Sequence, residues 1–220
     1  NPDAPISHHW QDSTHITFGV ATLGYSFGNF KIEGSAFKGR EPDENRYNFD
    51  SPRLDSFSGR VSWNPHRDWA LQVSHGYLKS PETTEPDVNQ HRTTASILYN
   101  RPLGDDANWS NSLVWGQNGS GEEATNALLF ETNYQRHANT FYARVERVQK
   151  SGHELVLPPP DDHRVFDVGS YALGYVRDLK RGGGLDVGLG AQVTFNTNES
   201  GLDTYYGGGG HTGFQVFLRI

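Results

Sequence analysis

Residues 185–196 read LDVGLGAQVTFN, and this stretch decides the fold because apolar residues alternate in it with small or polar ones. Side chains alternate between the two faces of a strand, so an extended chain has one apolar face and one polar face here. The apolar face holds Leu185, Val187, Leu189, Ala191, Val193 and Phe195, and the other holds Asp186, Gly188, Gly190, Gln192, Thr194 and Asn196. A strand needs about 9–11 residues to cross a bilayer at a tilt, and this stretch has that length. We expect Val187, Leu189 and Val193 to be exposed, and Gly188, Gly190 and Gln192 to lie on the polar face.

The same alternation recurs along the chain and predicts about eleven strands. They are expected at residues 15–27, 30–39, 55–64, 69–79, 91–100, 109–117, 125–135, 140–149, 165–178, 185–196 and 212–220. Short turns alternate with long polar connections. Residues 40–54, 80–90 and 118–124 are expected to be loops, and residues 101–108 are expected to be a turn. No segment has a sustained apolar period of about 3.6 residues, so no helix is expected, and residues 1–14 are interpreted as a loop. The expected fold class is all-β, an antiparallel up-and-down transmembrane β-barrel that forms a single domain over residues 1–220.

Aromatic residues flank the short turns. If opposite residues in each hairpin sum to a constant, Trp63 faces Trp69, Tyr99 faces Trp109, Tyr134 faces Phe141 and Phe27 faces Phe30. Rings that recur at one depth favour an aromatic belt at a membrane–water boundary. The alternative is ordinary cross-strand aromatic pairing in a soluble sheet.

The composition is unusual for a globular core. The mean hydropathy is -0.70 although 12% of the residues are aromatic, a combination typical of a barrel with a polar lumen and one thin apolar band. The chain has no run of about 18 apolar residues that would make a membrane helix. The absence of cysteine excludes disulfides and thiolate metal sites, and the net charge of -7 argues against nucleic acid as the main partner.

Charged and amide side chains are expected on the inward face of the strands. The candidate pore-lining residues are Lys31, Glu33, Arg60, Glu131, Arg144, Glu146, Gln192, Gln215 and Arg219. In a barrel with an open lumen, such residues set solute selectivity. The alternative is a lumen whose charges neutralise each other in ion pairs and which a loop closes. The turn at residues 136–139 places Glu131 directly opposite Arg144, so we expect a carboxylate–guanidinium contact between them.

The long connections are acidic and rich in histidine, but no spacing selects a metal or catalytic site. His8 and His9 are weak candidates for a metal site, and adjacent residues point opposite ways if the chain is extended. His75, His91 and Asp167 are the residues that an enzyme at the rim of a barrel would use. No motif of a known hydrolase, metalloprotease or nucleotide-binding loop is present. We therefore expect no catalytic residues and no cofactor.

The last eight residues, GFQVFLRI, place Phe214, Val216, Leu218 and Ile220 at alternating positions. This ending resembles the C-terminal assembly signal of Gram-negative outer-membrane β-barrel proteins, which usually end on Phe. The turns WNP at 63–65 and NRPLGD at 100–105 resemble those of uncharacterised proteobacterial barrels in this superfamily.

The resemblance implies a porin-like passive channel or structural barrel in the bacterial outer membrane. Its implied partners are outer-membrane lipid, lipopolysaccharide, the barrel-assembly machinery and small solutes. Because single-chain bacterial barrels have even strand numbers, we expect this chain to be the C-terminal part of a larger barrel. Two alternatives stay open: an outer-membrane enzyme or metal-binding barrel, and a soluble β-sandwich or jelly roll that acts on polysaccharide.

Overall fold

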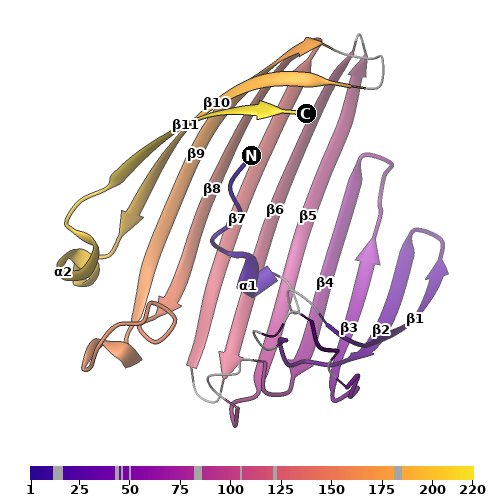
Figure 1. Ribbon diagram of the computed structural model, residues 1–220. Helices are drawn as coiled ribbons and strands as arrows, with labels where there is room; N and C mark the ends of the chain where they lie inside the picture. The colour runs from indigo at the N-terminus through magenta and orange to yellow at the C-terminus, as the bar shows by residue number, and fades with distance from the viewer. Residues whose placement is uncertain are drawn as a thin grey trace. The chain divides into compact units, whose positions relative to one another are not determined.

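The computed structural model describes residues 1–11, 17–42, 45, 47–49, 51–81, 86–104, 106–120, 123–180 and 185–220. The strands are β1 Val20–Phe27, β2 Phe30–Phe37, β3 Ser56–Trp63, β4 Trp69–Leu78, β5 Gln90–Gly104, β6 Ala107–Ser120, β7 Glu123–Arg136, β8 Asn139–Ser151, β9 Val165–Lys180, β10 Val187–Asn198 and β11 His211–Arg219. Within the described residues these eleven strands form one sheet in chain order, β1 to β11 (Figure 1). The pairs β1–β2, β2–β3, β3–β4, β8–β9, β9–β10 and β10–β11 are antiparallel. The predicted all-β, antiparallel up-and-down arrangement is confirmed, and insertion into a membrane stays a prediction.

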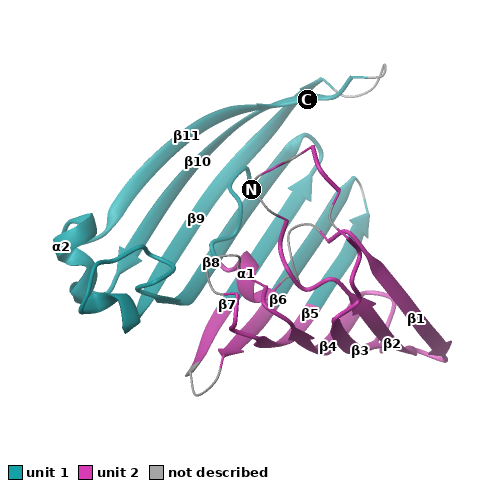
Figure 2. Cartoon of the chain, turned by 60° about the horizontal axis from the view of Figure 1, so that its bottom comes forward, with its two compact units in different colours: residues 1–6, 98–113, 128–220 teal, residues 7–97, 114–127 magenta. Residues whose placement is uncertain are grey.

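The chain divides into two compact units, which Figure 2 shows in different colours. Unit 1 comprises residues 1–6, 98–113 and 128–220, and unit 2 comprises residues 7–97 and 114–127. Strands β5, β6 and β7 contribute residues to both units. Each unit is described by itself below.

Short helical turns correct the expectation that the chain has no helix. The helices are α1 His8–Gln11 and α2 Asp203–Tyr206, and single turns of 3-10 helix lie at Asp161–His163 and Ser200–Leu202. A single turn contains too few positions to show an apolar period, which is why the pattern could not reveal them. The interpretation of residues 1–14 as a loop is therefore wrong over His8–Gln11, and residues 12–14 lie outside the described part of the chain.

Five strands, β5 to β9, are longer than the pattern indicated, and the largest extensions shorten two connections. The expected turn at 101–108 is short, because β5 continues to Gly104 and β6 begins at Ala107. The expected loop at 118–124 is also short, because β6 continues to Ser120 and β7 begins at Glu123. The alternation of apolar and polar residues could not reveal these extensions because they are mostly polar. Backbone pairing between neighbouring strands continues whatever the side chains are.

The alternation seen at 185–196 is present in β10 and its neighbours. Leu189 is 44% exposed whereas Gln192 is 4% exposed. On the polar face, a Cβ added at Gly190 would lie 2.4 Å from the ring of Phe217, so this glycine makes room for an aromatic side chain. Val193 pairs with Leu173 of β9 and with Phe214 of β11, and both partners are exposed.

Each unit presents many large apolar side chains to its surroundings. In unit 2 the exposed set includes Val20, Leu23, Tyr25, Phe27, Phe30, Ile32, Phe57, Val61, Trp63, Trp69 and Val73. In unit 1 it includes Trp109, Leu113, Leu128, Phe130, Phe141, Val145, Tyr171, Leu173, Leu179, Leu189, Phe195, Phe214, Val216 and Leu218. A soluble protein rarely exposes contiguous apolar surface on this scale.

Aromatic rings stack beside the short turns, with one pairing corrected. Phe27 pairs with Phe30 as predicted, with ring centroids 5.8 Å apart, and Phe30 stacks on Trp63 at 5.7 Å. Trp63 pairs with Leu71 rather than with Trp69. The connection between β3 and β4 is wider than a two-residue turn, which shifts the pairing by one side-chain repeat and keeps every residue on its predicted face.

The same clustering of rings continues in unit 1. Tyr99 contacts Trp109 at 5.6 Å between ring centroids, as predicted. Phe141 pairs with Tyr175 of β9, with their rings 5.0 Å apart. The predicted pairing of Tyr134 with Phe141 stays a prediction.

Two long connections of unit 1 pack on each other. Leu157 and Leu202 bury against Phe166, with Leu155 and Val168 at the margin. Beside this cluster, Asp161 accepts hydrogen bonds from Arg164 Nη1 at 2.8 Å and from the Tyr205 hydroxyl at 2.9 Å. The two connections are therefore joined by an apolar cluster and by a charged hydrogen-bond group.

The carboxyl of Asp161 is expected to titrate below its ordinary range. The hydrogen bonds from Arg164 and Tyr205 lower its pKa because they stabilise the carboxylate. Its folded pKa is lower than its unfolded pKa of about 3.9. The stabilisation is therefore fully present above that value and is lost as the pH falls through the folded pKa.

Carboxyl NMR titration checks this prediction. Tyr205→Phe is expected to move the pKa of Asp161 upward, because one hydrogen bond to the carboxylate is removed. The matched control is Tyr206→Phe, whose hydroxyl donates to the Leu155 carbonyl and not to Asp161. An unchanged titration in Tyr205→Phe would contradict the assignment.

Candidate functional site

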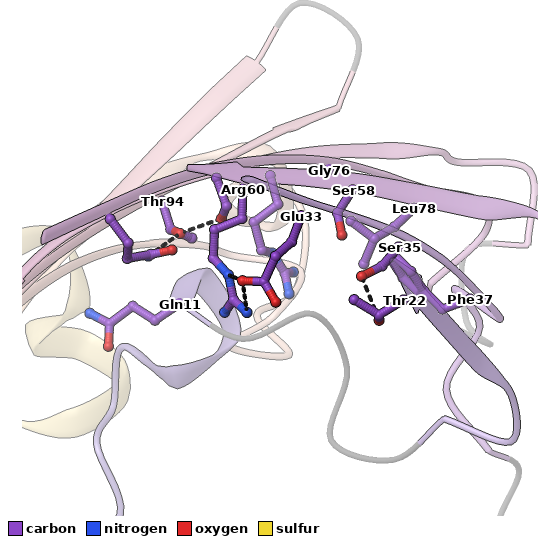
Figure 3. Close-up of a pocket in the computed structure, with 13 residues that line it drawn as sticks. Gln11, Thr22, Glu33, Ser35, Phe37, Ser58, Arg60, Gly76, Leu78 and Thr94 are labelled. Carbon is purple, nitrogen blue, oxygen red and sulfur yellow. Dashed lines mark hydrogen bonds and ion pairs between the residues drawn. The ribbon is translucent and has the colours of Figure 1, made fainter. Parts of the chain in front are cut away.

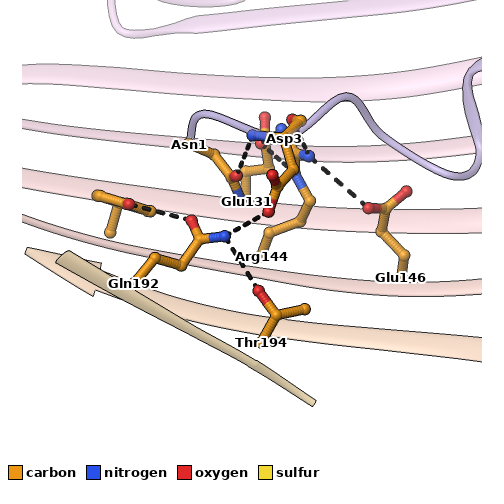
Figure 4. Close-up of polar contacts among 8 residues, drawn as sticks. Asn1, Asp3, Glu131, Arg144, Glu146, Gln192 and Thr194 are labelled. Carbon is orange, nitrogen blue, oxygen red and sulfur yellow. Dashed lines mark hydrogen bonds and ion pairs between the residues drawn. The ribbon is translucent and has the colours of Figure 1, made fainter. Parts of the chain in front are cut away.

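A charged cluster lies on the polar face of unit 1, and Figure 4 shows its contacts. Arg144 Nε of β8 donates to Glu131 Oε1 of β7 at 2.6 Å, so the predicted Glu131–Arg144 contact is confirmed. Arg144 Nη1 also lies 3.8 Å from Glu146 Oε1, two residues along the same face of β8. Arg144 is 8% exposed and Glu146 is 2% exposed. The guanidinium is therefore held between two carboxylates with little contact with water.

The first residues of the chain complete this cluster. The Asp3 carbonyl accepts a hydrogen bond from Arg144 Nη1 at 2.8 Å. The Asp3 carboxylate accepts hydrogen bonds from Gln192 Nε2 of β10 and, at 3.1 Å, from Gln215 Nε2 of β11. Gln192 in turn accepts a hydrogen bond from the Tyr142 hydroxyl at 3.0 Å. Three of the candidate pore-lining residues, Arg144, Gln192 and Gln215, thus hold the N-terminal segment of unit 1 against the polar face of β8, β10 and β11.

Asp3 and Tyr142 were not predicted as members of the site. Asp3 belongs to a stretch without periodicity, where a single carboxylate carries no signal. Tyr142 follows the outward residue Phe141, so the alternation of β8 predicts its inward orientation, although it was not among the candidate pore-lining residues.

Arg219 lies on the same face and pairs with Asp178. Gly188 of β10 pairs with both residues, with Arg219 on one side and with Asp178 on the other. Because Gly188 has no side chain, the ion pair between Arg219 Nη2 and Asp178 Oδ1 can pass over it.

The remaining candidate pore-lining residues form a second charged group on unit 2. Glu33 of β2 pairs directly with Arg60 of β3, and its carboxylate lies 2.7 Å from Arg60 Nη2. Lys31 Nζ lies 2.7 Å from the other oxygen of the same carboxylate. The nine candidate residues therefore divide between two groups, and in each group basic side chains are paired with acidic ones.

A polar cavity of about 340 Å³ adjoins the second group, and Figure 3 shows its lining. It is lined by Gln11, Thr22, Glu33, Ser35, Phe37, Ser58, Arg60, Gln72, Ser74, Gly76, Leu78, Arg92 and Thr94. Gln11 of α1 lies across the cavity from the sheet (Figure 3). Strands β1 to β5 supply the other side.

Helix α1 is fixed to the polar face of unit 2 by its tryptophan. Trp10 is 1% exposed, and its Nε1 donates to Thr125 Oγ1 of β7 at 2.9 Å. Asn118 Nδ2 of β6 donates to the His9 carbonyl at 3.2 Å. A Cβ added at Gly116 would lie 2.1 Å from the Trp10 carbonyl oxygen, so the glycine allows the backbones to approach closely. Trp10 was not predicted as an anchor because it lies in a segment without periodicity.

Gly116→Ala is expected to detach α1 from β6. The added methyl group cannot fit beside the Trp10 backbone, so either α1 or the strand must move. We expect the segment around Trp10 to lose protection in amide hydrogen exchange. Gly76→Ala is the matched control, because its nearest neighbour lies at an ordinary 3.4 Å on the same unit. Equal protection in the two variants would show that the close approach at Gly116 does not hold α1.

The two candidate histidines lie on the same short helix. His8 and His9 of α1 have ring centroids 4.3 Å apart, so the extended conformation in which they would point opposite ways is not present, and metal binding by this pair stays a prediction. In the part of the chain that the structure describes, no group of three or more His, Cys, Asp or Glu residues could hold a metal ion.

The rim residues that an enzyme would use are divided between the two units, with His75 and His91 in unit 2. His75 Nδ1 is hydrogen-bonded to Thr93 Oγ1 at 2.9 Å, and its ring stacks on His91 at 5.5 Å. Asp167 lies in unit 1, where it accepts from Arg147 at 3.0 Å. Among the described residues, no helix is long and apolar enough to cross a membrane.

The comparisons with known proteins found likeness to solved structures. No protein-family model matches the chain, and no curated protein matches it. One similar solved structure is the anion-selective porin from Comamonas acidovorans, at 11% sequence identity and a TM-score of 0.48. The alignment covers 82% of this chain and 49% of the porin, so the chain spans about half the length of that protein.

Proposed function

We propose that this chain is a porin-like β-barrel segment of the bacterial outer membrane that forms a passive channel for small solutes. The observation that carries the proposal is the division of the strands into an exposed apolar face and a polar face. Leu173 and Phe214, which both pair with Val193, are 62% and 83% exposed, whereas the neighbouring Gln192 on the opposite face of β10 is 4% exposed. A lipid environment removes the cost of such apolar exposure, because hydrocarbon replaces water around these side chains.

The rings beside the short turns support the same proposal. Phe27, Phe30 and Trp63 form a continuous stacked row at the ends of β1, β2 and β3. Amphipathic and bulky rings are favoured at the level of the lipid headgroups. In the proposal these rows are the girdle at one boundary of the bilayer, and the partners of the outer surface are membrane lipid and lipopolysaccharide.

The paired charges give the proposed lumen its character. In unit 1 the proposed lumen is lined by Arg144, Glu131, Glu146, Gln192, Gln215 and Arg219. In unit 2 it is lined by Lys31, Glu33 and Arg60. In this arrangement the segment that carries Asp3 narrows the passage, since it lies against the polar face of β8 and β10. Both signs of charge are present and paired, so strong ion selectivity is not expected.

Reconstitution into planar bilayers tests the proposal. The full-length protein, extracted with detergent, is expected to give discrete conductance steps. Asp3→Ala is expected to raise the conductance, because the N-terminal segment loses its bonds to Gln192 and Gln215. Solubility without detergent would contradict the membrane location. Membrane insertion without any conductance, in the protein and in Asp3→Ala, would favour a structural barrel instead.

A further inference from the structure

The cavity of unit 2 is lined mainly by uncharged hydrogen-bonding groups. Its hydroxyls and amides come from Gln11, Thr22, Ser35, Ser58, Gln72, Ser74 and Thr94. Its apolar lining residues include Phe37 and Leu78, which are 4% and 1% exposed and so present little surface to it. The volume of about 340 Å³ lies within the range of small-molecule sites.

The lining groups retain unused hydrogen-bonding capacity. Thr22 bonds to Ser35 at 2.8 Å, and Ser74 bonds to Thr94 at 2.7 Å. Each hydroxyl has one donor and two acceptor positions, so one bond leaves others available. The Nε2 atom of Gln11 is buried and has no hydrogen-bond partner among the described residues. Such an amide is costly unless something in the cavity accepts its hydrogen bond.

The charged groups at the cavity already have hydrogen-bond partners. The Glu33 carboxylate accepts from Arg60 Nε at 2.9 Å. Arg92 donates to Asn118 Oδ1 and to Gln90 Oε1, both at 2.6 Å. A charged ligand would have to compete with these hydrogen bonds, whereas an uncharged ligand uses the remaining hydrogen-bonding capacity of the hydroxyls and amides.

We propose that this cavity is a transient binding site for a small, uncharged, polyhydroxylated solute, of the sugar or polyol class. The proposal rests on the proposed channel function, since the solute reaches the polar face through the lumen. Hydroxyl groups of the solute exchange hydrogen bonds with Ser58, Ser74 and the Gln11 amide. Without an exposed aromatic platform the binding is weak, which suits a channel because the solute must also leave.

Calorimetric titration of the detergent-solubilised full chain with maltose tests the site. Gluconate and glucosamine serve as anionic and cationic comparison probes. We expect maltose to bind and the two charged probes to bind more weakly. The double variant Gln11→Ala/Ser58→Ala is expected to lower maltose affinity about tenfold, through the loss of two hydrogen-bonding groups.

Ser62→Ala is the matched control, because Ser62 lies on the same face of β3 as Ser58 but does not line the cavity. It is expected to bind maltose as the unaltered protein does. Circular dichroism verifies that all variants keep their strands. Absence of maltose binding, or equal affinity in the double variant and the unaltered protein, would overturn the site.

Conductance measured in parallel separates this proposal from the proposed function. A channel that conducts but neither binds maltose nor is blocked by it would overturn the site alone. Maltose binding that depends on Gln11 and Ser58 in a protein without conductance would overturn the channel and retain the site as a binding pocket.

Discussion

Leu173→Arg is expected to destabilise the protein in a bilayer by about 2–4 kcal/mol. Leu173 lies at the centre of β9, where it pairs with Ala143 and Val193, and it is 62% exposed. If this face meets lipid, the substitution places a guanidinium near the bilayer midplane, where its desolvation is most costly. The measurement is the free energy of unfolding by urea in lipid vesicles.

Leu179→Arg is the matched control for depth. Leu179 belongs to the same strand and is 63% exposed, but it lies at the register shift one residue from the end of β9. Arginine at this level reaches the headgroups, so a cost of only about 0–1 kcal/mol is expected. Because the two leucines have nearly equal exposure, a sheet in water would respond alike to both substitutions. Equal costs would therefore contradict the membrane location.

Arg144→Met is expected to lower the free energy of unfolding by about 3–5 kcal/mol. The substitution removes the cation beside Glu146, whose side chain is 2% exposed, and leaves that carboxylate without its guanidinium. It also removes the hydrogen bond to the Asp3 carbonyl. The expected cost exceeds the value of about 0–1 kcal/mol that is typical of a water-exposed pair, because the structure buries Arg144.

The double variant Arg144→Met/Glu146→Gln tests this explanation. Removing the buried carboxylate together with the guanidinium is expected to restore most of the lost stability, since the charge that the guanidinium neutralised in the buried part of the cluster is then removed as well. Glu131→Gln alone is expected to cost less than Arg144→Met, because the Glu131 side chain is 37% exposed and can be solvated. A double variant as unstable as Arg144→Met would show that lost packing, and not the charge of the buried Glu146 carboxylate, causes the destabilisation.

The sequence by itself determined the strands, their faces and the pairing across the tightest hairpins. The alternation at 185–196 predicted that Leu189 is exposed and that Gln192 is not, and the short turns predicted Phe27 opposite Phe30 and the contact of Glu131 with Arg144. These features are local: side chains change face at every residue of a strand, and a two-residue turn leaves little choice of register. The predicted pairing of Trp63 with Trp69 was wrong because the turn before Trp69 is wider and leaves more than one possible register.

Only the tertiary structure decided what lies against the polar faces. Asp3 meets Gln192 across 189 positions of sequence, and Trp10 meets Thr125 across 115. Neither Asp3 nor Trp10 lies in a periodic segment, so the neighbouring sequence does not indicate the residue that each one contacts. Their positions depend on complementary donors, acceptors and space, such as the missing side chain at Gly116, that distant strands bring together. The burial of Arg144 and the shape of the polar cavity depend on the contacts of these N-terminal residues with distant strands. Because such contacts join residues far apart in the sequence, no local pattern could predict them.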